Sequence, residues 1–214
     1  MTGSSIISIE ENLFASIRDP PSSVETENVS VIQSSPYSET DHLLHLKGLD
    51  TGYRALAIAL QAFQPQNSNF AFDSYTDAFD ISRIVALART ITAKLNEPFP
   101  DTEVYIIVFR SILHKHVLES SQKRDLLAYI DKRSHSEANQ SGGLLKYWFG
   151  TPDKIYGKNL ATCWWRNKRD AVRGGGGNYH RQAMKAVQGW YQHWKVEEYQ
   201  LNITKDGYTM TKIK

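Results

Sequence analysis

Apolar residues recur at helical spacing in two segments of the first half of the chain. Residues 52–63 carry apolar side chains on most faces of a helix, which is typical of a buried helix. Residues 81–95 carry them three and four positions apart, and Asp80 offers an N-cap just before them. We therefore predict two helices, the first of them buried.

Strand and linker patterns follow. A run of β-branched and aromatic residues over 103–110 is typical of a strand in a sheet, and weaker alternation over 42–49 indicates another strand. Helical patterns resume over 111–119 and 122–130. Residues 133–143 offer no apolar face to a core, so they are predicted to form a polar linker.

Beyond that linker, the pattern predicts two more helices, over 159–172 and 179–195. The four glycines at 174–177 lie between them and provide the positive φ that a helix C-terminus favours. They also allow two other interpretations, a flexible connector or a phosphate cradle at the start of the second helix.

The end of the chain alternates apolar and polar residues over 198–204 and 208–213. Asp206-Gly207 separates the two runs, and this dipeptide is a strong signal for a β-hairpin. We therefore predict an α+β fold that is predominantly helical, with a small antiparallel sheet that contains residues 103–110 and the C-terminal β-hairpin.

The chain divides into an arm and one folded domain. Residues 1–40 are predicted to be an acidic, largely disordered arm, because Ser, Thr, Pro and Glu bury too little apolar surface to offset the entropy of ordering. Within it, residues 6–17 have a short amphipathic pattern. Residues 41–214 are predicted to be a single folded domain, with 144–195 a basic, aromatic-rich module and 196–214 a terminal hairpin.

Composition narrows the class of protein. The chain has 214 residues, 41% of them hydrophobic, which is enough for a real core. No stretch approaches the length of a membrane span, and the N-terminus lacks the basic region of a secretory signal. The single cysteine, Cys163, excludes an internal disulfide. We therefore expect a reducing compartment, cytoplasm or nucleus, of a host cell if the protein is an effector or viral accessory protein.

Charge and tryptophan are distributed unevenly. All five tryptophans lie between Trp148 and Trp194. Residues 146–195 contain ten Lys or Arg and two acidic residues, a balance of +8, whereas residues 1–145 contain twelve and eighteen, a balance of −6. Basic side chains pair with phosphates and aromatic rings stack on bases in proteins that bind single strands. The chain is therefore predicted to be a non-enzymatic binding protein for RNA, DNA or another polyanion.

The residues predicted to form this nucleic-acid-binding face are the basic and aromatic side chains of the module. They are Lys158, Trp164, Trp165, Arg166, Lys168, Arg169, Arg173, Tyr179, Arg181 and Lys185. Two other interpretations stay open: an acidic protein partner, and a solvated basic face that pairs with the acidic arm.

One short segment suggests an enzyme instead. Residues 51–57, Thr-Gly-Tyr-Arg-Ala-Leu-Ala, resemble the nucleophile helix of OTU-type and related papain-like cysteine proteases. In that family a cysteine stands at the start of the helix, where the helix N-terminus lowers the pKa of the thiol. Thr51 occupies this position, so the resemblance implies an inactive relative.

Cys163 is the alternative nucleophile. Residues 161–164, Ala-Thr-Cys-Trp, resemble the small-residue–Cys–Trp step of papain-like helices, and His180 or His193 would supply the base. This arrangement would imply a thiol-dependent hydrolase or transferase. A lone cysteine is also commonly a small buried apolar residue.

No cofactor and no metal site is expected. The metal-capable residues His114 and His116 are two positions apart, and side chains at that spacing point away from each other in a helix.

Overall fold

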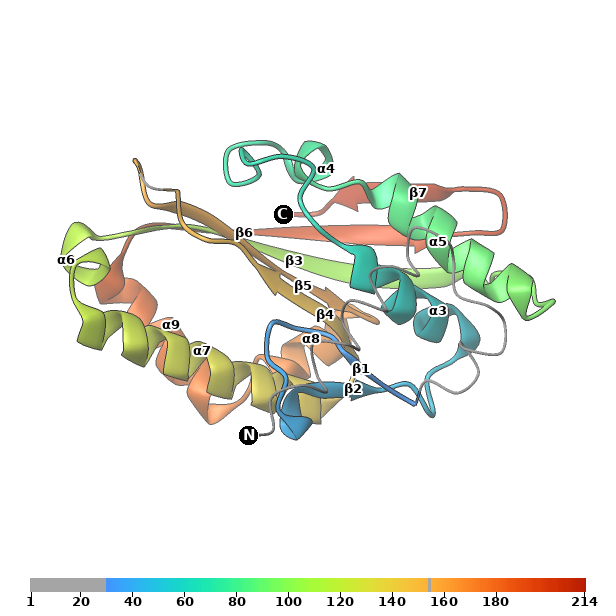
Figure 1. Cartoon of the computed structure of the whole chain (residues 1–214), viewed down its shortest axis with the longest axis horizontal. Coiled ribbons are helices and arrows are strands. Elements are labelled where there is room, and N and C mark those ends of the chain that lie inside the picture. The colour runs from blue at the N-terminus through green and yellow to red at the C-terminus, as the bar shows by residue number, and fades with distance from the viewer. Residues whose placement is uncertain (1–29, 154) are drawn as a thin grey trace, which may run out of the picture.

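The apolar run that follows Pro100 forms the central strand of a five-stranded antiparallel sheet (Figure 1). The computed structural model describes residues 30–153 and 155–214. Its main sheet has the order β4-β5-β3-β6-β7, so β3 pairs on both sides: Ile106 lies opposite Trp164 of β5 and Tyr199 of β6. The five strands are β3 (Thr102–Leu113), β4 (Leu144–Phe149), β5 (Lys158–Trp165), β6 (Tyr191–Ile203) and β7 (Tyr208–Lys212).

Two apolar helices cover one end of one face of this sheet, which we call the outer face. They are α3 (Thr51–Ala59), which continues into η2 (Leu60–Ala62), and α5 (Ile81–Lys94). Side chains that alternate along β3 point into the core beneath them, among them the fully buried Val104, Ile106 and Val108. Alternation along the strand therefore decides which residues build this main core.

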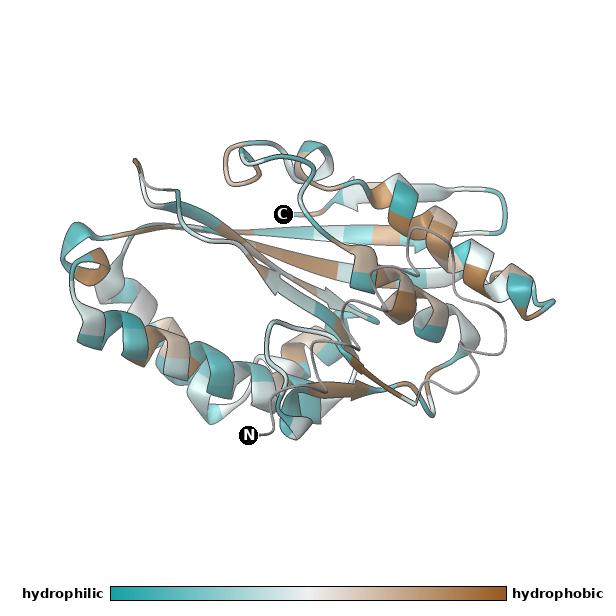
Figure 2. Ribbon diagram, in the orientation of Figure 1, coloured by the Kyte–Doolittle hydropathy of each residue, from teal (hydrophilic) through white to brown (hydrophobic). Residues whose placement is uncertain are grey.

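Three helices lie on the other face, which we call the inner face. They are α7 (Ser121–Ser141), α8 (Lys168–Gly174) and α9 (Asn178–Trp190), and α7 and α9 pack side by side. Figure 2 shows that much of α7 is hydrophilic. The core here is smaller: Tyr105, Ala138, Leu144, Tyr147, Trp165 and Ala171.

The N-terminal segment of the described chain packs against α7 and β4. Its elements are β1 (Val31–Gln33), η1 (Thr40–His42) and β2 (Leu43–His45), and β1 and β2 form an antiparallel ribbon. Ile32 and Ser34 are buried, and the backbone amide of Tyr147 donates to the carbonyl oxygen of Ser34 at 2.8 Å. Packed structure therefore begins before residue 41. The rest of the predicted arm, residues 1–29 with the amphipathic pattern of 6–17, lies outside the described residues.

Two short helices complete the described fold, α4 (Tyr75–Ala78) and α6 (Lys115–Leu118). Within the described ranges, none of the helices combines the length and the apolar character that crossing a bilayer requires.

Several predicted elements are confirmed. The buried helix after Asp50 is α3 with η2, and the helix after Asp80 is α5, where the Asp80 carboxylate accepts from the backbone amide of Arg83 at 2.9 Å. The predicted strand lies within β3, and the C-terminal hairpin is β6 paired with β7. The α+β class is confirmed. The predicted predominance of helix is not, because the sheet contains two long strands, β3 and β6.

Four other predictions of secondary structure are wrong. Residues 133–143 are no linker, since α7 continues to Ser141. Residues 159–172 form β5 and then α8, and the helix predicted to reach residue 195 ends at Trp190, where β6 begins. The helix predicted to start at residue 111 begins only after β3 ends. In each case pairing with β3, or burial of polar residues against another segment, outweighs the local pattern.

The glycines after Arg173 serve close packing. None of the four has a positive φ, and Gly175 at the end of α8 has a φ of −78°. A Cβ on Gly177 would lie 2.1 Å from a carboxylate oxygen of Glu137. That carboxylate accepts from the backbone amides of Tyr179, at 2.9 Å, and His180, at 3.2 Å. The start of α9 is therefore occupied by a side chain of α7, in place of the phosphate that a cradle would hold.

Candidate functional site

The two adjacent tryptophans proposed as stacking platforms lie in the interior. Trp164 is 0% exposed in the core under the outer face, and Trp165 is 3% exposed in the core under the inner face. Neighbouring strand residues point to opposite faces, so the two rings cannot share a surface. The prediction that they stack on bases is therefore wrong for this structure.

The basic residues around α8 are largely paired. The carboxylate of Asp170, itself buried, accepts from Arg166 at 2.8 Å and from Arg173 at 2.7 Å. Lys168 lies 3.5 Å from Glu198 of β6. This part of the predicted face carries less net charge than the composition suggests.

The rest of the predicted face is scattered. Arg169 and Lys185 are exposed on α8 and α9, and Arg181 donates to the carbonyl oxygen of Gly176. Tyr179 packs beneath the guanidinium of Arg133 at 4.9 Å. Lys158 lies at the start of β5, the end of the strand opposite to Trp165. The sequence-predicted residues therefore do not form one continuous surface.

Lys158 instead belongs to a basic pocket on the outer face, beyond the end that α3 and α5 cover. The pocket has a volume of about 370 Å³ and lies between the loop of residues 71–74 and strands β3, β5, β6 and β7. The strand register places its cations together: Arg110 lies opposite Lys195, and Ile112 lies between Lys158 and His193. The basic side chains that line it are Arg110, Lys158, His193, Lys195 and Lys212.

A buried carboxylate organises these cations. Glu197 is 6% exposed, and one of its oxygens lies 3.4 Å from Arg110, 2.9 Å from Lys195 and 3.2 Å from Lys212. Burial acts to raise the pKa of Glu197, but hydrogen bonds from Lys195, Tyr199 and Lys212 and the charge of Arg110 outweigh it and lower that pKa to about 2. Glu197 is therefore an anion at neutral pH, surrounded by three cations.

The pocket keeps a surplus of positive charge. Counting Lys and Arg, its lining has four cations, and Asp73 and Glu197 are its two acidic residues, which leaves +2 with histidine neutral. Arg110 is fixed in place because it also donates to the backbone carbonyl oxygens of Ala71, at 3.2 Å, and Asp73, at 2.8 Å. A fixed guanidinium beside two lysines is an arrangement that binds anions.

Two further groups lie at this pocket. Phe72 is 45% exposed, and the ammonium group of Lys158 lies 4.3 Å from the centre of its ring. The side-chain oxygen of Asn159 is buried without a hydrogen-bond partner in the described part of the chain. The pocket therefore offers an aromatic surface in addition to its cations.

The structure does not place the candidate nucleophile Cys163 in a helix. Thr51 does begin a buried helix, α3. Cys163 lies within strand β5, away from any helix N-terminus, and burial, with a smaller contribution from the charge of Asp131, raises the pKa of its thiol. Burial also lowers the pKa of His180. A raised thiol pKa is the opposite of what a thiolate nucleophile requires.

Metal-capable side chains are also dispersed. The rings of His114 and His116 stack at 5.4 Å beside α6, whereas His135 lies in α7. Over the described ranges, no three His, Cys, Asp or Glu side chains gather in a geometry that could hold a metal ion.

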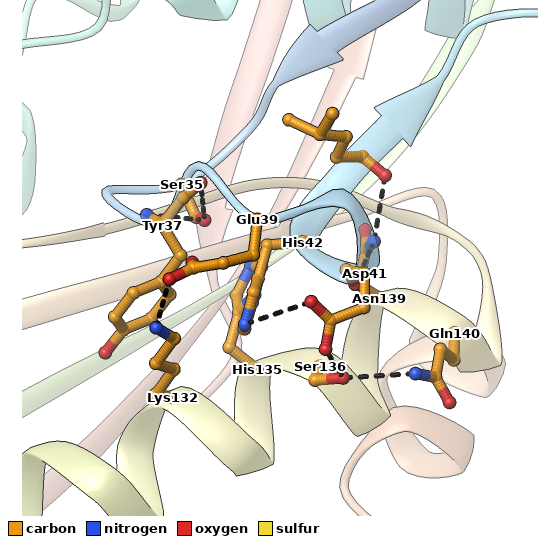
Figure 3. A network of polar contacts seen from close by, with 11 residues as sticks. Ser35, Tyr37, Glu39, Asp41, His42, Lys132, His135, Ser136, Asn139 and Gln140 are labelled. Atoms are coloured by element: carbon orange, nitrogen blue, oxygen red, sulfur yellow. Dashed lines mark hydrogen bonds and ion pairs between the residues drawn. The ribbon is translucent and has the colours of Figure 1, made fainter. Parts of the chain in front are cut away.

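A second polar cluster was missed by sequence reasoning. It joins the N-terminal segment to α7: the Nδ1 atoms of His42 and His135 lie 2.6 Å apart, and Ser136 donates to Asp41 at 2.6 Å (Figure 3). Next to it, Asp131 accepts from the hydroxyl groups of Tyr37, at 2.5 Å, and Tyr147, at 2.7 Å. Tyr37 lies in the stretch interpreted as an arm, and His135 and Ser136 lie in the stretch interpreted as a linker, so no signal in the sequence indicated that they converge with the others.

Two solved structures resemble part of the fold. Rv0793 from Mycobacterium tuberculosis is 14% identical, with a TM-score of 0.37 over 44% of this chain and 91% of that one. A conserved protein of unknown function from Bacteroides thetaiotaomicron VPI-5482 is 12% identical, with a TM-score of 0.35 over 46% of this chain and 97% of that one. Likenesses at this level carry no argument about function.

The sequence comparisons are much stronger. UPF0643 protein PB2B2.08 of Schizosaccharomyces pombe (strain 972 / ATCC 24843) is 48% identical over 202 residues, which cover 93% of this chain and 92% of that protein. The family model described as PB2B2.08-like matches residues 33–214, from β1 to the end of the chain. The chain therefore belongs to the PB2B2.08-like family.

Proposed function

We propose that this protein is a non-enzymatic binding protein that holds a phosphorylated ligand in the basic pocket of the outer face. The proposal keeps the polyanion class predicted from the composition, but it moves the site from α8 and the two tryptophans to the sheet. Lys158 is the residue that the two sites share.

The observation that carries the proposal is the charge around Glu197. One carboxylate faces Arg110, Lys195 and Lys212, so it neutralises one of three cations. Like charges held this close repel, and a bound dianion such as a phosphate monoester removes that repulsion. Burial of Glu197 keeps the three cations in place before a ligand arrives, which reduces the entropy lost on binding.

The shape of the pocket favours a ligand of about nucleotide size. Its volume of about 370 Å³ lies near the lower end of the usual range for small-molecule sites. Phe72 supplies a ring on which a base can stack. A free nucleotide and the terminal phosphate of a nucleic acid strand share this chemistry, and the experiment below distinguishes them.

Replacing both Lys195 and Lys212 with glutamine is expected to weaken binding of adenosine 5′-monophosphate at least about tenfold, which corresponds to about 1.4 kcal/mol. The substitutions remove two phosphate-pairing charges and leave Arg110 and Glu197 paired. Isothermal titration calorimetry at two salt concentrations measures the effect. Binding to the wild-type protein should also weaken as salt rises, because it depends on charge.

The matched control replaces two exposed lysines outside the pocket, Lys185 and Lys205, with glutamine. It makes the same change in net charge and should leave the affinity unchanged. Equal weakening in both double variants would show that net charge alone attracts the ligand, and would contradict the pocket.

Further titrations distinguish between the kinds of ligand that could supply the phosphate group. Inorganic phosphate should bind more weakly than the nucleotide, and Phe72→Ala should weaken the nucleotide alone. A different outcome is that a single-stranded oligonucleotide binds more tightly than the nucleotide and loses this binding in the control variant. That result would favour a dispersed polyanion surface over the pocket. Retention of an acidic peptide with no affinity for the nucleotide would favour a protein partner, and would likewise contradict the proposal.

A further inference from the structure

The inner face of the central strands is only partly covered. On β3, Ile106 and Val108 point to the outer face and are fully buried, whereas Ile107 and Phe109, which point to the inner face, keep part of their surface exposed. On β5, Ala161 and Cys163 are partly exposed on the same inner face. In the middle of a sheet covered by helices, apolar side chains are normally buried.

The arrangement of the helices explains this exposure. Helices α7 and α9 pack mainly against each other and reach the sheet mostly at its margins, near β4 and the start of β6 (Figure 1). The middle of the inner face is therefore not covered directly by a helix. We call the partly exposed side chains there, Ile107, Phe109, Ala161 and Cys163, the inner-face site.

This region is enclosed as well as exposed. Burial raises the pKa of the Cys163 thiol, and it raises the pKa of Tyr191 to about 12, although solvent reaches both side chains. These side chains are therefore covered on several sides by protein atoms but not sealed from solvent.

A carboxylate from α7 lies over this part of the inner face. Asp131 accepts from the hydroxyl group of Tyr147 on β4 at 2.7 Å, and Tyr147 lies opposite Cys163 on β5. The charge of Asp131 also acts on the pKa of Cys163, of Tyr191 on β6 and of His180 on α9. Asp131 is itself partly exposed.

This carboxylate lacks a basic partner among the described Lys and Arg side chains. Asp131 accepts from the hydroxyl groups of Tyr37 and Tyr147, but across residues 30–153 and 155–214 no Lys or Arg pairs with it. Two neutral donors leave most of its negative charge uncompensated. A buried charge without a partner is costly, and a cationic ligand would remove that cost.

The rings nearby suit a cation with an apolar body. Phe149 packs against both Tyr37 and Tyr147 beside Asp131, with its ring centre 6.2 Å from that of Tyr37 and 5.6 Å from that of Tyr147. Farther along the inner face, Phe109 packs against Trp194 at 5.6 Å. Aromatic faces attract cations, and together with a carboxylate they form the usual recognition site for an ammonium group.

We propose that the inner-face site binds a small apolar amine, with the ammonium group of the ligand against Asp131 and its apolar body over Ile107, Phe109 and Ala161. This site lies on the opposite face of the sheet from the basic pocket, so neither proposal depends on the other.

The test compares three probes of nearly equal size that differ in charge: 2-phenylethylamine, 2-phenylethanol and 3-phenylpropionate. Titration calorimetry at pH 7.5 should give an affinity for the amine at least about tenfold higher than for the alcohol. The carboxylate should not bind at the inner face, because Asp131 repels it. Equal affinities for the amine and the alcohol, or no saturable binding of the amine, would overturn the proposal.

Asp131→Asn isolates the charge. The variant keeps an acceptor for one tyrosine and is expected to lower the affinity for the amine to that of the alcohol, while the affinity for the alcohol changes less than about twofold. Thermal unfolding monitors the fold of the variant. If the variant does not fold, the charge series on the wild-type protein still decides the outcome.

A second variant tests the location. Ala161→Leu adds volume at the inner face and should weaken both the amine and the alcohol. The Lys195→Gln/Lys212→Gln protein, altered only on the outer face, should bind the amine as the wild type does. Unchanged amine binding in Ala161→Leu would place the amine elsewhere and contradict the proposal.

Discussion

Replacing Trp164 with alanine is expected to destabilise the protein by about 3–5 kcal/mol, because it empties the centre of the main core. The indole ring is 0% exposed and packs edge-on against Phe63 at 5.4 Å. Its Nε1 donates to the hydroxyl oxygen of Tyr75 at 3.0 Å, and that hydroxyl group also contacts Thr162 at 2.9 Å. The substitution therefore creates a cavity and leaves a buried hydroxyl group with one partner fewer.

Urea unfolding followed by circular dichroism measures this loss. Trp164→Phe is the control, since it removes the same hydrogen bond but retains much more of the packing than alanine does, and it should cost clearly less. If Trp164 served instead as a stacking platform, Trp164→Ala would keep the stability of the wild type and lose affinity for single-stranded nucleic acid. That outcome would contradict the placement of Trp164 in the core.

Acidification is expected to destabilise the protein steeply below about pH 6.5, because of the buried histidine pair. The Nδ1 atoms of His42 and His135 lie 2.6 Å apart, so one must donate and the other accept, which allows at most one of the two rings to be charged. Burial lowers the pKa of both rings, and with the charge of His42 it lowers the pKa of His135 from 6.5 to about 3.

Proton uptake by the unfolded chain sets the direction in which the free energy of unfolding changes with pH. Below pH 6.5, His135 of the unfolded chain binds a proton that His135 of the folded chain does not accept until about pH 3. The free energy of unfolding therefore falls as the pH falls through this window, by about 1.4 kcal/mol per pH unit for His135, and His42 adds to it. Charged and titratable side chains also face the pair: Tyr37, Glu39, Asp41, Lys132, Arg133 and Tyr147.

A double variant, His42→Asn/His135→Asn, separates the pair from these neighbours. Two amides can still form one hydrogen bond, but they do not titrate. Asp131, whose pKa is raised chiefly by burial, acts in the opposite direction at low pH in both proteins, so it cancels in the comparison. The unfolding free energy is measured between pH 7.5 and 4.5. Its slope against pH, expressed as the number of protons taken up on unfolding, should be smaller in the variant by at least one proton. Equal slopes would show that the pair does not control acid stability.

The histidine pair also connects to the inner-face site. Figure 3 shows that Tyr37 belongs to the same N-terminal segment that His42 and Asp41 hold against α7. Tyr37 donates to Asp131. Loss of the pair at low pH is therefore expected to expose Asp131 before the main core unfolds, and amide hydrogen exchange of residues 31–45 would detect it.

Local patterns in the sequence were sufficient for the elements that carry their own signals. The helices after Asp50 and Asp80 have apolar spacing, and the side chain of Asp80 caps the second of them. The hairpin around Asp206-Gly207 has alternation and a turn dipeptide. Such signals act between residues close in the chain, so they do not depend on distant partners. The class α+β and the uneven charge also follow from the sequence alone.

Only the tertiary structure decided the identity of β5 and the end of α7. The stretch around Cys163 has no strong local preference, and pairing with β3 on one side and β4 on the other makes it a strand. The polar residues near Ser136 stay helical because the segment around Asp41 and His42 satisfies their hydrogen bonds.

Both candidate sites depend on the same kind of long-range placement. The basic pocket joins the loop near Phe72 to residues of β3, β5, β6 and β7. The inner-face site lies beside Asp131, which accepts from Tyr37 and Tyr147 of two other segments. The composition gives the number of cations and aromatic rings in the chain. It does not give their positions in space, and charges interact according to their distance in space. The register of the sheet and the docking of α7 therefore determined which of those side chains face each other.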